Sequence, residues 1–174
     1  MEYDIRLEQH SGQPLAVVRL RARLQELARV IPDACGKVWS VIKAQQVNGA
    51  GRHVAVYWDD QINLDVGVEL ATPFEGSGEV VGSATPTGPV ARTTHYGPYG
   101  KLNEAHETIR MWCGENQFKL AGPSWEVYGH WKDEWKADPT KICTEVFYLL
   151  SQTDPLTTFH LTHRHELSGD QEIG

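Results

Sequence analysis

Cysteine, basic charge and long apolar runs are all scarce in this sequence. Only three cysteines occur among the 174 residues, and no pair has the spacing of a zinc site or of a CxxC motif. An odd, scattered set does not form a disulfide framework, so we expect a reducing compartment, the cytoplasm. No apolar run approaches the roughly 18 residues of a membrane-spanning helix. The N-terminus also lacks the basic and apolar segments of a signal peptide.

The charge balance argues against a nucleic-acid partner. The formal net charge is −7, whereas binding to phosphates needs a basic face. The chain is long enough for one domain with a sizeable core, or for two small repeats that share one. We therefore expect a single domain over residues 1–174, without a cofactor, that binds neither nucleic acid nor membrane.

The second half of the chain repeats the pattern of the first, and each half is predicted to run strand, helix, strand, strand. The predicted elements are 15–20, 32–46, 53–58 and 62–70 in the first half, and 90–96, 102–112, 125–128 and 144–150 in the second. Pro32 suits the first turn of the first helix. Ile31 matches Leu102, and Tyr57 matches Tyr128, each 71 positions later.

The last strands of the two halves match at a larger spacing. Asp65 precedes Glu145 by 80 positions, so the second hairpin carries nine extra residues within 129–141. The fold class is therefore α+β, with two repeats (about 1–80 and 81–154) related by a pseudo-twofold axis and a C-terminal extension, 155–174. We expect antiparallel sheets with helices packed on one side and a ligand cleft between the repeats.

Glu145 is the most unusual residue of the predicted strands. It lies in the middle of an apolar strand, where alternation places Phe147 on the same face and where Asp65 is the repeat equivalent. If both faces are covered, this carboxylate is desolvated and needs a partner. The alternative is an edge strand with Glu145 in water.

Aromatic residues accumulate around these strands and predict an aromatic box with one acid, which suits a flat organic cation. The candidate ligand-binding residues, besides Glu145, Phe147 and Asp65, are Tyr57, Tyr128, Trp112, Trp131 and Trp135. Trp112 also fits the apolar stripe of a helix, and its alternative role is in the core. Trp131 and Trp135 lie in the insertion, either as a cover over a ligand or as a solvated tip.

Two further patterns are weak. Cys143 shares the face of Glu145, but a cysteine nucleophile needs a histidine base within reach. His163 and His165 share a strand face and could bind metal, although a solvated strand or tail is favoured. We expect no metal site.

Several short motifs together resemble the GyrI-like small-molecule-binding domain, the effector-binding module of some AraC-type and MerR-type multidrug regulators. The motifs are His95-Tyr96-Gly97-Pro98-Tyr99, the helix face Leu102, Ala105, Ile109 and Trp112, then Gly122-Pro123, Glu126-Val127-Tyr128 and Thr144-Glu145-Val146. The resemblance implies that Glu145 contacts cationic, lipophilic ligands and that Phe147 lines the same pocket. Since no segment remains for a DNA-binding domain, a stand-alone member is expected.

Three hypotheses follow. The first is a binding protein for hydrophobic, cationic small molecules. The second is a hydrolase of cyclopropane-bearing compounds, an activity that the resemblance implies for some stand-alone members, with Glu145 activating water as the catalytic residue. The third is a protein-binding inhibitor, because gyrase inhibition is associated with some relatives.

Overall fold

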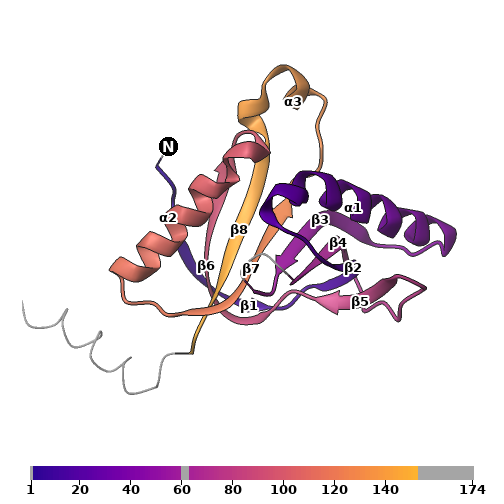
Figure 1. The fold of residues 1–174 in the computed structure, drawn as a ribbon, viewed down its shortest axis with the longest axis horizontal. Coiled ribbons are helices and arrows are strands. Elements are labelled where there is room, and N and C mark those ends of the chain that lie inside the picture. The colour runs from indigo at the N-terminus through magenta and orange to yellow at the C-terminus, as the bar shows by residue number, and fades with distance from the viewer. Residues whose placement is uncertain (1, 60–62, 153–174) are drawn as a thin grey trace, which may run out of the picture.

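The chain forms one antiparallel sheet of eight strands with its two long helices on the same side (Figure 1). The computed structural model describes residues 2–59 and 63–152. The predicted extension 155–174, the candidate metal ligands His163 and His165, and residues 60–62 of the predicted hairpin lie outside this description. No helix of the described residues is long and apolar enough to cross a membrane.

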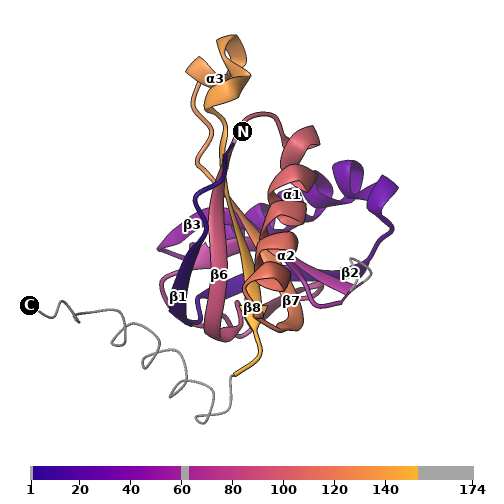
Figure 2. The same ribbon diagram turned by 90° about the vertical axis from the view of Figure 1, so that its left-hand side faces the viewer.

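The strands are β1 (Arg6–Ser11), β2 (Pro14–Arg21), β3 (Ala50–Tyr57), β4 (Asn63–Leu70), β5 (Val80–Ala84), β6 (Thr87–Tyr96), β7 (Leu120–Tyr128) and β8 (Cys143–Leu150). The α-helices are α1 (Leu27–Ala44), α2 (Leu102–Glu115) and α3 (Glu134–Ala137), and short 3-10 turns are η1 (Leu24–Glu26), η2 (Tyr99–Lys101) and η3 (Pro139–Lys141). The α3 segment lies in the predicted insertion and projects beyond the rest of the sheet (Figure 2).

The predicted repeat is confirmed. The first unit is β2-α1-β3-β4 and the second is β6-α2-β7-β8. The sheet order is β1-β6-β8-β7-β3-β4-β2-β5. The strands outward from β3 (β4, β2, β5) are the repeat equivalents of those outward from β7 (β8, β6, β1), so the pseudo-twofold axis passes between β3 and β7. Asp65 and Glu145 lie on the equivalent strands β4 and β8.

The two edge strands are exchanged between the repeats. β1 precedes β2 in sequence but pairs with β6, and β5 precedes β6 but pairs with β2. Each repeat therefore completes the sheet of the other, and the halves cannot separate without breaking these ladders. Period-2 patterning does not specify such long-range partners, which is why the sequence predicts the strands without their order.

The helix α1 begins at Leu27, five residues before the start predicted from Pro32. The first four N–H groups of a helix have no partner within it, so proline is tolerated at the start. As the sixth residue, Pro32 instead removes a hydrogen bond to the Ala28 carbonyl. The extra turn is held by packing, since Leu27 and Ile31 lie against the core under α1.

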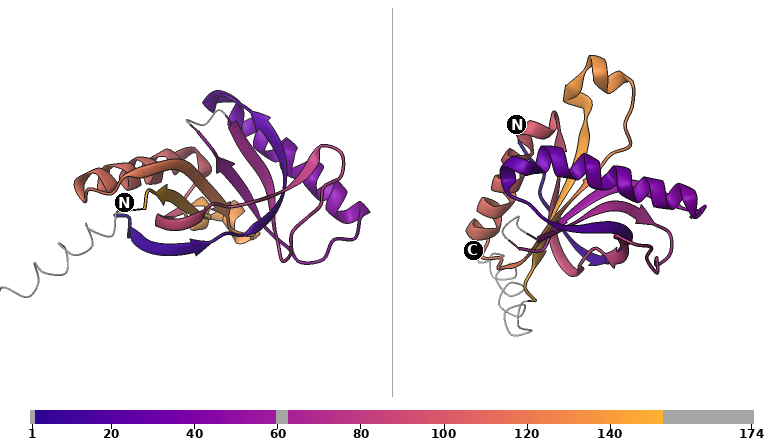
Figure 3. Two further views of the ribbon diagram at one scale, coloured as in Figure 1. Left: turned by 90° about the horizontal axis from the view of Figure 1, so that it is seen from below. Right: turned by 45° about the vertical axis from the view of Figure 1, so that its right-hand side comes forward.

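Both faces of the sheet are buried. On the helix side, one core lies under α1 and another under α2, and the coiled sheet encloses a third core on its other side (Figure 3). In the third core the rings of Trp125 and Phe147 stack with centroids 5.1 Å apart and planes 3° from parallel. Strand alternation thus decides which side chains reach the helices and which do not.

The repeat-equivalent of Phe147 is Gly67, and the close approach of β2 explains the difference. A Cβ at position 67 would lie 1.8 Å from the Ala16 carbonyl oxygen.

We predict that Gly67→Ala lowers the free energy of unfolding by roughly 1–3 kcal/mol. Gly114→Ala, in α2 where an added Cβ meets nothing, should stabilise by up to about 1 kcal/mol. Urea denaturation measures both, and an unchanged midpoint for Gly67→Ala would contradict the packing at β2.

Candidate functional site

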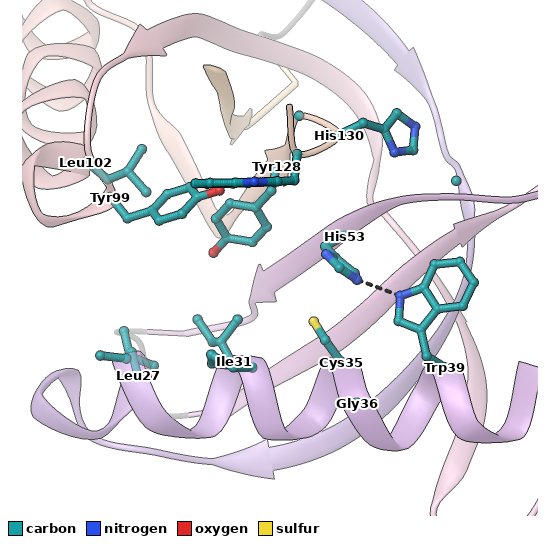
Figure 4. A pocket seen from close by; sticks show the side chains of 15 residues that line it. Leu27, Ile31, Cys35, Gly36, Trp39, His53, Tyr99, Leu102, Tyr128 and His130 are labelled. Carbon is teal, nitrogen blue, oxygen red and sulfur yellow. Dashed lines mark hydrogen bonds between the residues drawn. The ribbon is translucent and has the colours of Figure 1, made fainter. Parts of the chain in front are cut away.

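A cleft of about 690 Å³ lies between α1 and the start of α2, over the seam where β3 meets β7 (Figure 4). The residues that line it are Leu27, Ala28, Ile31, Pro32, Cys35, Gly36, Trp39, Gly51, His53, Tyr99, Leu102, Tyr128, Gly129, His130 and Trp131. Both repeats contribute to it. The α1 wall is apolar because the helix turns only part of its hydrophobic stripe toward the sheet.

The floor of this region contains one carboxylate, that of Glu126 on β7. A second hollow of about 580 Å³ shares Leu27, Ala28, Tyr99 and Leu102 with the cleft and extends it down to Glu126. Glu126 is 5% exposed, and Ala55 is its partner across the seam.

Three hydrogen-bond donors surround this carboxylate. The Tyr57 hydroxyl donates to Glu126 Oε2 at 3.2 Å, and the Tyr128 hydroxyl donates to the same oxygen. His106 Nε2 lies 2.7 Å from Oε1, and its Nδ1 lies 2.8 Å from the Tyr148 hydroxyl. A carboxylate only accepts, so His106 Nε2 carries a proton and donates to Glu126.

The tyrosines at the floor are held as proton donors. Burial, and next the negative charge of Glu126, raise the pKa of Tyr57 and the pKa of Tyr128 well above the ordinary value of 10.0. No lysine or arginine of the described residues forms an ion pair with Glu126. The groups that contact the Glu126 carboxylate among the described residues are thus the hydroxyls of Tyr57 and Tyr128 and the imidazole of His106.

The opposite end of the cleft has a different polar pair. Trp39 on α1 donates its indole N–H to His53 Nε2 on β3 at 2.6 Å (Figure 4). Burial, and next the nearby His130, lower the pKa of His53 below its ordinary value of 6.5. This end of the cleft therefore carries a neutral imidazole.

The structure brings some of the predicted ligand-binding residues to the cleft. Tyr57 and Tyr128 contact Glu126, and Trp131 lines the cleft mouth while 53% exposed. Trp135 is 4% exposed and packs edge-on against Trp131 with ring centroids 5.6 Å apart. Trp135 supports the insertion from beneath and is absent from the cleft lining.

The structure places Glu145 and Phe147 on the sheet face away from the helices. Glu145 accepts from Arg52 Nη1 at 2.5 Å and from Arg92 Nη1 at 2.6 Å, so this carboxylate is paired and does not reach the cleft. Phe147 lies in the third core.

Asp65 and Trp112 also lie away from the cleft. Asp65 faces the same side as Glu145, 3.3 Å from Arg19 Nε and 2.6 Å from Ser83 Oγ. Trp112 stacks on Phe118 at 5.4 Å beside the core under α2, which matches its alternative role.

Sequence reasoning did not select Glu126 as a site residue, although a signal existed. Tyr128 was a candidate, and strand alternation places Glu126 on the same face two residues earlier. The match between the two repeats gave no signal for Glu126, because the equivalent position in the first repeat is Ala55. The described residues contain no group of three histidine, cysteine, aspartate or glutamate side chains arranged for a metal ion.

Two half-buried histidines, His10 and His53, make stability depend on pH. Burial is also the main cause that lowers the pKa of His10, as it does for His53. In the unfolded chain both titrate near 6.5, so below this pH the unfolded state binds protons that the folded state does not. Stability should be highest above pH 6.5 and fall as the pH drops toward the lowered folded values.

Urea denaturation at about pH 7.5 and about pH 5 measures this fall. His53→Gln cannot titrate, so its stability should fall less over the same interval than that of the wild type. An identical pH dependence in the two proteins would show that His53 is not held neutral by the fold.

Comparison with known proteins identifies the family and the fold. The family model of the GyrI-like small molecule binding domain matches residues 3–147, and no curated protein matches the chain. The C-terminal domain of EcmrR superposes with a TM-score of 0.70 at 19% identity, covering 88% of this chain and all of that one.

Two other solved structures share the fold. SAV2435 bound to tetraphenylphosphonium has a TM-score of 0.63 at 15% identity, covering 94% of this chain and 100% of that one. A hydrolase encoded by lin2189 from Listeria innocua has a TM-score of 0.53 at 12% identity, covering 84% and 91%. The family match spans most of the chain, and this protein therefore belongs to the GyrI-like small molecule binding domain family.

Proposed function

We propose that this protein captures lipophilic, cationic small molecules in the cleft between α1 and α2. The observation that carries the proposal is Glu126, a buried carboxylate without a lysine or arginine partner among the described residues, at the floor of an aromatic and aliphatic cleft. Arg110 lines the same hollow but forms no ion pair with Glu126, so an organic cation can pair with this carboxylate. The apolar groups of the cation contact the α1 wall.

The aromatic rings add to this attraction. Tyr99 and Tyr128 pack edge to face with ring centroids 5.7 Å apart, and both rings line the cleft. A cation over an aromatic face gains about 0.5–2 kcal/mol, with the larger values where water is excluded. SAV2435, which shares the fold, has been solved bound to tetraphenylphosphonium, a cation of this class.

The insertion between β7 and β8 is proposed to cover the ligand. Trp131 lies at the cleft mouth and rests on the buried Trp135, so its indole is supported on one side and open to the cleft on the other. The nine extra residues of the second repeat thus place an aromatic surface over the opening.

The three cysteines Cys35, Cys113 and Cys143 are free, which suits a reducing compartment such as the cytoplasm. The net charge of −7 favours cationic partners over nucleic acid. Both observations agree with a role in binding small organic cations inside the cell.

Replacing Glu126 tests the proposed site directly. Glu126→Gln keeps the shape and removes the charge, so we expect the affinity for tetraphenylphosphonium to fall by about 1–3 kcal/mol. A neutral analogue, tetraphenylmethane with a solubilising hydroxyl, should lose much less, because its affinity comes from apolar burial. Calorimetric titration measures both ligands.

Glu145→Gln and Asp65→Asn are the matched controls, since each removes a strand carboxylate on the opposite face. Both should leave the affinity for the cation unchanged. If Glu145→Gln weakens cation binding and Glu126→Gln does not, the ligand site lies on the other face of the sheet.

Trp131→Ala tests the cover. The side chain is largely exposed, so the stability of the fold should change little, while the affinity for tetraphenylphosphonium should fall by about 1–2 kcal/mol. Met111→Ala removes an equally exposed apolar side chain on α2 that does not line the cleft. Equal affinities for these two variants would place Trp131 outside the site.

Hydrolysis is the second candidate function, and the neighbours of Glu126 favour it. A carboxylate beside two protonated tyrosines offers a base and an acid at one point. Water would attack a strained ring carbon and give its proton to Glu126. The electrons of the broken carbon–carbon bond would pass to a conjugated carbonyl, which a tyrosine hydroxyl protonates.

Product analysis after incubation with a cyclopropane-bearing electrophile tests this activity. We expect ring-opened, hydrated product with the wild type and none above the buffer rate with Glu126→Gln. Tyr128→Phe should slow the reaction by about 10²- to 10⁴-fold if its hydroxyl is the acid. A wild-type rate equal to that of buffer would leave binding as the only function of the cleft.

A further inference from the structure

The contact between Trp39 and His53 fixes the proton of an imidazole that lines the cleft. An indole N–H only donates, so the nitrogen that faces it, His53 Nε2 at 2.6 Å, must accept with its lone pair. A neutral imidazole with Nε2 as acceptor carries its proton on Nδ1. The indole therefore selects the tautomer of His53.

The proton on His53 Nδ1 is left for a ligand. Within residues 2–59 and 63–152, no protein group accepts a hydrogen bond from this nitrogen, and the imidazole lines the cleft. Burial and the neighbouring His130 both oppose a second proton on the ring, which agrees with the acceptor role of Nε2. The site is thus a single, oriented N–H donor.

This donor has a defined place relative to Glu126. His53 pairs with Tyr128, and Ala55 pairs with Glu126, so the donor and the carboxylate are two positions apart along the seam. At about 3.3 Å per residue along a strand and about 4.8 Å between neighbouring strands, the Cα atoms of His53 and Glu126 are about 8 Å apart. One small molecule can span it.

We propose that the ligand of this cleft carries a hydrogen-bond acceptor, such as a carbonyl oxygen, about one aromatic ring away from its cationic centre. The acceptor binds His53 Nδ1–H while the cation lies over Glu126. This inference rests on the proposed binding function and refines it. The Trp39–His53 pair selects, among lipophilic cations, those with an acceptor at this position.

Two matched probes test the selection. (4-Acetylphenyl)triphenylphosphonium carries a carbonyl one ring from its cationic centre, and (4-isopropylphenyl)triphenylphosphonium has the same size and charge without an acceptor. A neutral hydrogen bond is modest in water, so the wild type should bind the acetyl probe about 2- to 10-fold more tightly. Dissociation constants are measured by tryptophan quenching and checked by calorimetry.

Three variants assign the preference to His53. His53→Phe should bind both probes equally, whereas His53→Gln, whose amide can accept from Trp39 and still donate, should retain a preference. His10→Phe changes a histidine on the other face of the sheet, beside Trp125 and Phe147, and should leave the wild-type ratio intact. A wild type without preference, or a preference that survives His53→Phe, would overturn the inference.

A second measurement does not depend on any variant. The ring ¹⁵N resonances of His53 in the wild type should show Nδ1 protonated and Nε2 unprotonated, and the opposite tautomer would overturn the inference.

Glu126→Gln separates the two proposals. If it leaves the affinity for the isopropyl probe unchanged, or if neither probe binds the wild type, the proposed function fails and this inference with it. If it weakens both probes while the ratio does not depend on His53, only the acceptor inference fails.

Discussion

The pairing of β3 with β7 is the contact on which the molecule depends. It joins the two repeats through five residue pairs, from His53 opposite Tyr128 to Tyr57 opposite Ser124. Because both strands come from the centre of the sheet, α1 and α2 lie on either side of this seam, and the space between them becomes the cleft. The side chains of β3 and β7 that face the helices form the floor of the cleft. Those on the opposite face of the sheet join the third core.

A symmetric scaffold thus produces an asymmetric site. The repeats supply two equivalent tyrosines, Tyr57 and Tyr128, which donate to one carboxylate. That carboxylate has no counterpart, since the repeat equivalent of Glu126 is Ala55. Likewise only the second repeat has the insertion that carries Trp131. The groove therefore has a carboxylate at one end and an imidazole at the other.

The sequence predicts the repeat, the helices and the strand types because these depend on local periodicity. It also predicts Tyr57, Tyr128 and Trp131 near one another, because the matched tyrosines had to lie on equivalent strands. It does not predict the arginine partners of Glu145, since a carboxylate in an apolar strand gives the same sequence pattern whether it faces a ligand or the arginines of other strands. Arg52 lies 93 positions away from Glu145, and such pairing is set by sheet order, which local patterns do not carry.

The choice of carboxylate is therefore the central claim: we propose that Glu126, and not Glu145, faces the ligand. The measurement that tests it most directly is a crystal structure of the protein with tetraphenylphosphonium. The account predicts the phosphonium between α1 and the start of α2, above Glu126 and beneath Trp131, with the ion pairs of Glu145 unchanged. A cation bound on the opposite face of the sheet, beside Glu145, would contradict it.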